Sequence, residues 1–220
     1  MLRAHGLTLY EPGDLGGEMA SPGIADLRQI AAWAVKFLNA PNQQLGRRGP
    51  VCPFTRLSMN SNCFLLAWAG CEHDVQSAES TVDRYRRWFL ELLEQSERTR
   101  EHLLTILVVL PGFDRADSSP LDALQRRLKG AFVREGLMVG QFHPRCEQSG
   151  LWNEDFRPLK APVPLLAIRR MVASDLPFLL GSASHLSAYL DRFAPGIPGH
   201  VRRLLVARIA YTADQEPIAV

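Results

Sequence analysis

The apolar positions of this chain follow two patterns that alternate along the sequence, short continuous runs and repeats at helical spacing. Continuous runs predict four buried strands, at residues 63–69, 103–110, 137–143 and 163–171. Apolar residues three or four positions apart predict helices at residues 21–38, 80–97, 119–135, 184–193 and 200–210. Ser21-Pro22 and Ser119-Pro120 are typical of helix starts, because a serine side chain caps the first turn and proline is well accommodated at the first helical position.

The order of these elements predicts the fold class. Strands that alternate with helices of this length imply crossovers above a sheet, so we expect an α/β or α+β layered sandwich. Its central sheet should have about four strands covered by helices, with further helices at the C-terminus. The run at 103–110 is continuously apolar, which favours a central strand. We divide the chain into a mobile N-terminal arm (1–20), a core domain (21–175) and a C-terminal helical extension (176–220).

Composition narrows the class of partner. The 220 residues are 46% hydrophobic, and the formal net charge is +2, so neither a nucleic-acid nor a membrane partner is expected. The longest apolar run has about seven residues, far short of the roughly 20 that a membrane span requires. The N-terminus lacks the apolar core of a signal peptide, and the four cysteines include no CxxC pair. We therefore expect a cytoplasmic protein with free thiols.

Two segments without regular periodicity contain most of the reactive side chains. They span residues 47–58 and 143–162, and both adjoin predicted strands. A loop of about 20 residues is uncommon in a compact domain unless it is functional or disordered, and Trp152 and Phe156 make disorder a poor explanation. Ligands of α/β sheets collect where loops meet strand ends, so we expect both segments to face one pocket.

His143 is the sharpest candidate within these segments. Its imidazole could act as an acid or base, or bind a metal ion or haem iron. It could equally hydrogen-bond a loop carbonyl at the end of a strand. Cys52 is a candidate nucleophile if His143 lies within hydrogen-bond reach, and otherwise a buried thiol. Cys146 could share a metal with His143, although two ligands are too few for a zinc site.

Arginines offer a second kind of chemistry. Arg157 and Arg169 could each hold an anionic group through the planar guanidinium. Arg157 could instead pair with an acidic neighbour and clasp the loop. On a strand, Arg169 and Arg170 point to opposite faces, which leaves one available to a site or a buried carboxylate. The remaining candidate ligand contacts are Phe54, Thr55 and Asn153.

Short motifs around these residues resemble a known family. The chain carries Cys52-Pro53-Phe54 early and Phe142-His143-Pro144 late, with Asn153 and Arg157 ahead of Pro162-Val163-Pro164. In these motifs the chain is similar to a family of uncharacterised bacterial domains of unknown function. The resemblance covers about residues 25–175. It implies that the Cys52, His143, Asn153 and Arg157 positions recur together, and it implies no reaction.

Three functional hypotheses follow. The first is a small enzyme, suited to specialised metabolism, that takes an anionic small molecule and uses His143 as acid, base or metal ligand. Its cofactor is open, and haem bound non-covalently through His143 is the leading version. The second is a binding domain that uses residues 143–162 as a recognition surface, and the third makes that loop purely structural. The sequence contains no GxGxxG, P-loop, GxSxG or HExxH motif, and a homo-oligomer stays open.

Overall fold

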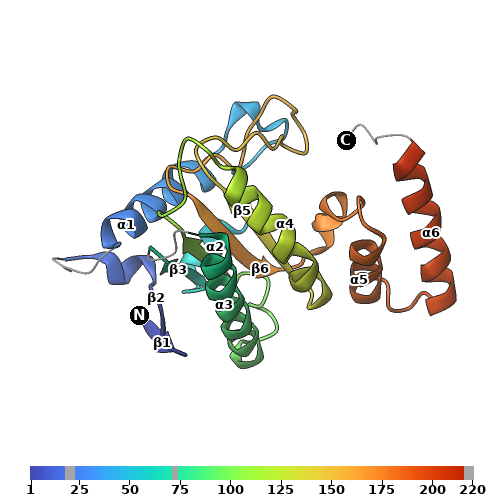
Figure 1. Cartoon of the computed structure of the whole chain (residues 1–220), viewed down its shortest axis with the longest axis horizontal. Helices are drawn as coiled ribbons and strands as arrows, with labels where there is room; N and C mark the ends of the chain where they lie inside the picture. Colours follow the sequence, from blue (N-terminus) through green and yellow to red (C-terminus); the bar gives the residue numbers. More distant parts are fainter. Residues whose placement is uncertain (18–22, 71–73, 216–220) are drawn as a thin grey trace.

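A four-stranded mixed sheet forms the centre of the molecule (Figure 1). The computed structural model describes residues 1–17, 23–70 and 74–215. The strands are β3 (Phe64–Trp68), β4 (Thr105–Val109), β5 (Leu137–Phe142) and β6 (Leu165–Arg170), in the spatial order β3-β4-β6-β5. β3 and β4 are parallel, and β6 is antiparallel to both of its neighbours. β5 therefore runs parallel to β3 and β4, and the predicted layered fold is confirmed.

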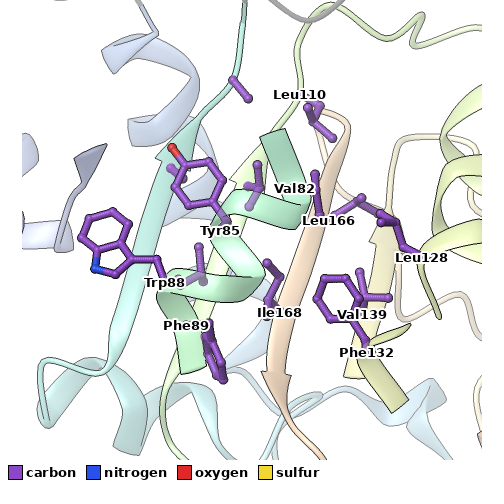
Figure 2. Packing of buried hydrophobic residues seen from close by; sticks show 14 of the residues in the cluster. Val82, Tyr85, Trp88, Phe89, Leu110, Leu128, Phe132, Val139, Leu166 and Ile168 are labelled. Atoms are coloured by element: carbon purple, nitrogen blue, oxygen red, sulfur yellow. The ribbon is translucent and has the colours of Figure 1, made fainter. Parts of the chain in front are cut away.

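Two long helices cover one face of the sheet. They are α3 (Val75–Gln95) and α4 (Ser119–Arg134), which connect β3 to β4 and β4 to β5. Their apolar faces pack on the sheet in one cluster, in which Tyr85 and Trp88 of α3 lie on the β3 side and Phe132 of α4 lies beside Val139 of β5 (Figure 2). Phe89 and Phe132 are fully buried there, and burial of such rings contributes roughly 1.5–3 kcal/mol each.

A shorter helical layer covers the other face. α1 (Ile24–Trp33) continues into a π-helical segment, η2 (Ala34–Leu38), and both pack on β3, β4 and β6. The turn η3 (Gln43–Leu45) and the short helix α2 (Thr55–Asn60) follow before β3. The predicted start of the first helix at Ser21-Pro22 lies outside the described residues, as does Cys71.

The N-terminal residues take part in the fold. The sequence predicts a mobile arm at residues 1–20, but β1 (Leu2–Ala4) and β2 (Leu7–Leu9) form a hairpin, followed by the turn η1 (Pro12–Leu15). Tyr10 exchanges backbone hydrogen bonds with Leu66 of β3, both at 2.8 Å. Leu9 is fully buried as a result. The few apolar residues of this segment pack into the core and hold it in place, although its Gly-rich composition suggested a mobile arm.

The C-terminal helices lie beside the layered core, at the periphery of the molecule. η4 (Ala173–Phe178) and α5 (Ala183–Phe193) pack on Met138 and Met171, and α6 (Gly199–Gln215) contacts α5 at the periphery (Figure 1). Among the described residues, no helix combines the length and the apolar character needed to cross a membrane.

The strand directions give the sheet two distinct edges. The carboxyl ends of β3, β4 and β5 lie at one edge, with His143 immediately beyond β5. Their amino ends lie at the other, where β6 ends at Arg170, opposite Leu137. The candidate residues therefore divide between two places about one strand length apart, roughly 20 Å for six residues.

Candidate functional site

His143 lies at the carboxyl end of β5 and faces α4. Its ring is only 2% exposed. Nε2 lies 3.1 Å from Oδ1 of Asp122, a residue in the first turn of α4 whose side chain is 29% exposed. The imidazole therefore joins the end of a strand to the start of a helix, and the carboxylate is the part of the pair that solvent reaches.

The chain returning from the long loop holds the backbone of His143 in place. Its N–H donates to the carbonyl of Leu159 at 3.3 Å, and its own carbonyl accepts from Cys146 N at 3.2 Å and Ala161 N at 3.3 Å. The preceding side chain, Phe142, points to the opposite face of the sheet, as alternation along a strand requires, and meets Trp33 edge to face. His143 is thus fixed from both sides of its own backbone.

The second ring nitrogen of His143 is unusual. Nδ1 is buried and has no hydrogen-bond partner among the described residues. A buried N–H without a partner costs about 1–3 kcal/mol, more than a bare lone pair in an apolar setting. The network therefore favours the tautomer with its proton on Nε2, which donates to the Asp122 carboxylate and leaves Nδ1 unprotonated.

Cys146 lies close behind this pair and is a poor nucleophile. It is 2% exposed, and burial raises the pKa of its thiol, with the negative charge of Asp122 acting in the same direction. A protonated thiol is neither an effective nucleophile nor a metal ligand. Across residues 1–17, 23–70 and 74–215, no three His, Cys, Asp or Glu side chains gather as a metal site would require.

The geometry at His143 also bears on the haem hypothesis. An iron atom bound at Nε2 would have to displace Asp122, and one bound at Nδ1 would have to enter packed protein interior. The acid–base role requires neither rearrangement. The residues around His143 therefore fit proton transfer better than axial ligation.

The other segment predicted to share this pocket lies elsewhere. Cys52 packs on the α1 face of the sheet, and its N–H donates to Leu38 O at 2.9 Å. Phe54 stacks edge to face on His102, just before β4, and Thr55 begins α2 with 4% exposure. Because β4 and β5 run parallel, the start of β4 and the end of β5 lie at opposite edges. The structure does not bring these three residues to His143.

The long loop instead meets residues that immediately precede the 47–58 segment. Asn153 Nδ2 donates to Gln44 O at 2.7 Å, and its Oδ1 accepts from Asp155 N at 3.0 Å. Gly46 lies so close to Trp152 that an added Cβ would come within 2.4 Å of the Trp152 carbonyl oxygen. Asn153 is therefore a connecting residue between two loops.

Both predicted anion-binding arginines are engaged within the protein. Arg157 pairs with Glu147 at 3.3 Å and donates to the carbonyl of Glu154, so it forms the clasp rather than an open binding site. Arg169 donates two hydrogen bonds to the buried Asp175 carboxylate, at 2.7 and 2.5 Å. Arg170, on the opposite face, pairs with Glu101 at 3.0 Å.

Asp122 is a candidate functional residue that the sequence pattern did not single out. An acidic residue in the first turn of a helix is ordinarily explained by the helix dipole, which conceals any further role. Its position after the Ser119-Pro120 start is compatible with that ordinary explanation. Only the crossover from β4 through α4 to β5 brings it to His143.

The chain forms a mixed α/β domain with a buried imidazole, paired with a partly exposed carboxylate, at the carboxyl edge of its parallel strands. The model of a family described as a domain of unknown function, DUF6875, matches residues 27–204, and the chain belongs to this family. The expected membership in an uncharacterised family is confirmed. The match extends beyond residue 175, so η4 and α5 belong to the family domain. No curated protein and no solved structure matches the chain.

Proposed function

We propose that this protein is an enzyme of small-molecule metabolism in which Asp122, held in place by His143, removes a proton from the substrate. The observation that carries the proposal is the contact between a buried imidazole and a partly exposed carboxylate, 3.1 Å apart. We expect this activity in the cytoplasm, since Cys52, Cys63 and Cys146 are free thiols.

The two residues have different parts in the proposed reaction. Asp122 is the group that a substrate can reach, so it is the general base. It removes a proton from the substrate, the bond to that proton breaks, and the electron pair stays on the substrate. His143 is a positioning residue, which holds one carboxylate oxygen through Nε2–H and leaves the other free. Arg157 and Arg169 are already paired, and the proposal assigns them no contact with the substrate.

Metabolite profiling can test this proposal without a known substrate. A small-molecule extract is incubated with the wild-type protein, Asp122→Asn, His143→Gln and a control, Asp155→Asn, an exposed carboxylate in the long loop. Wild type and control should deplete the same metabolite, and Asp122→Asn should do so about 10²–10⁴-fold more slowly. His143→Gln should show a smaller loss together with a shifted pH profile. Equal rates for Asp122→Asn and wild type would refute the proposal.

An absorption spectrum separates the acid–base proposal from the haem version. Haemin is added to wild type and to His143→Ala, and the Soret region is recorded. The acid–base proposal predicts the same weak, non-specific spectrum for both proteins. A sharp Soret band that only the wild type shows would overturn it and assign His143 to the iron.

One observation favours the alternative of a recognition surface. Trp152 is 67% exposed on a loop whose backbone is otherwise fixed by Asn153, Phe156 and Gly150. Exposed aromatic side chains on ordered loops are enriched where proteins bind partners. If the loop recognises a protein, Trp152→Ala should abolish a co-purifying partner while Asp122→Asn retains it. The opposite result would reject this alternative.

A further inference from the structure

A cavity lies at the amino edge of the parallel strands, far from Asp122 and His143. It has a volume of about 230 Å³. Three arginines line it, Arg98 after α3, Arg170 at the end of β6 and Arg192 near the end of α5. Because the three side chains come from separate elements, their grouping depends on the tertiary fold and not on the local structure of one helix.

The charges around this cavity do not cancel. The three arginines contribute +3 and Glu101 contributes −1, which leaves +2 with His102 neutral. Glu101 is occupied by Arg170, whose Nε lies 3.0 Å away in an ion pair that lacks hydrogen-bond geometry. Neither Arg98 nor Arg192 has a carboxylate partner within the part of the chain that the structure describes.

Arg192 is the most constrained of the three. Its Nε is buried without a hydrogen-bond partner among the described residues, and its guanidinium lies over the Phe193 ring, 5.4 Å from the centroid. Burial lowers the pKa of Arg192 and the positive charge of Arg170 lowers it further, while the negative charge of Glu101 acts in the opposite direction. The positive charge of Arg170 is unfavourable for Arg192 in the absence of an anion, and a bound anion would offset this repulsion through charge-assisted hydrogen bonds.

From these observations we propose that the Arg98–Arg170–Arg192 cavity binds a small phosphate monoester. A phosphate monoester carries about −1.5 to −2 charges at pH 7, which matches the local excess of +2. Planar guanidinium groups bind its oxygens in bidentate fashion. Met171, Val172 and Phe193 form an apolar wall against which the organic part would pack. The volume suits a ligand below the usual drug-sized range of roughly 300–1,000 Å³.

Calorimetry with phenyl phosphate and with inorganic phosphate tests the proposal. Arg98→Gln and Arg192→Gln are compared with Arg126→Gln, an exposed arginine of α4 outside the cavity. Wild type and Arg126→Gln should bind phenyl phosphate more tightly than inorganic phosphate, because only the ester reaches the apolar wall. Each cavity variant should lose about tenfold or more in affinity, since it removes a charge-assisted contact.

Thermal melting gives a second measurement that does not depend on a measurable heat of binding. Phenyl phosphate should raise the Tm of wild type and Arg126→Gln but not that of Arg192→Gln. Without ligand, Arg192→Gln should melt no lower than wild type, because repulsion between Arg170 and Arg192 is relieved. The proposal is wrong if wild type binds neither phosphate, or if the three variants bind equally.

Discussion

At the scale of single residues, Asp175 contributes strongly to stability. It is 2% exposed, accepts two hydrogen bonds from Arg169 and a third from Val172 N at 2.8 Å. We expect Asp175→Ala to lower the free energy of unfolding by about 3 kcal/mol, the low end for a broken buried pair, because Arg169 keeps some contact with solvent. Chemical denaturation measures this change, with Ser174→Ala as an exposed neighbouring control.

A double variant separates the loss of the charge pair from the loss of packing. Arg169→Met combined with Asp175→Leu removes both charges, so no unpaired carboxylate or guanidinium remains. Its stability should lie between those of wild type and Asp175→Ala. A double variant less stable than Asp175→Ala would show that hydrophobic packing, and not the unpaired Arg169, explains the loss.

At the scale of elements, the contact between Gly46 and Trp152 couples the two loops. Gly46 has a φ of +76°, and an added Cβ would lie 2.4 Å from the Trp152 carbonyl oxygen. We expect Gly46→Ala to force the loops apart at a cost of roughly 1–3 kcal/mol. Hydrogen exchange should rise across residues 143–162, which include the backbone partners of His143.

Gly17→Ala is the matched control for this loop contact. Gly17 has a similar φ of +85°, but no described residue other than its chain neighbours lies within 4 Å of its added Cβ. It therefore reproduces the backbone strain without the clash. If both variants loosened residues 143–162 equally, the effect would not come from the contact between Gly46 and Trp152.

The positions of the elements could be predicted well from the sequence, for a physical reason. A strand covered on both faces is continuously apolar, and β4 forms within the predicted range of residues 103–110. Helix starts are predicted less well. α3 begins at Val75 rather than residue 80, because the Asp74 side chain caps it by accepting from Gln76 N and Ser77 N. The start of α3 is therefore set by one polar residue, and a polar residue does not contribute to the hydrophobic periodicity from which the helix was predicted.

At the scale of the whole molecule, the order of the strands in the sheet could not be predicted from the sequence pattern. β6 inserts between β4 and β5, and its own apolar pattern would suit several positions in the sheet. The order nevertheless decides which residues meet. It puts Phe54 and His143 at opposite edges, pairs Asp122 with His143 across a crossover, and leaves Arg170 at the arginine-lined cavity. Candidate residues could therefore be named from the sequence, but their grouping could not.

The packing of α5 on α4 should respond to pH through His185. Burial lowers the pKa of this imidazole below its usual value, and the positive charges of Lys129 and Arg134 on α4 lower it further. Between the lowered pKa and 6.5, the unfolded chain binds more protons at this group than the folded chain does. Stability must therefore rise with pH through that window, and protonation below it weakens the contact between α5 and α4.

Thermal melting between about pH 5 and pH 7.5 measures this dependence. Wild type should gain stability as pH rises, and His185→Gln should lose that part of the gain because glutamine stays neutral. His200→Gln, an exposed histidine at the start of α6, should keep the wild-type profile. A His185→Gln profile parallel to that of wild type would mean that the pH response of the C-terminal helices arises from another group.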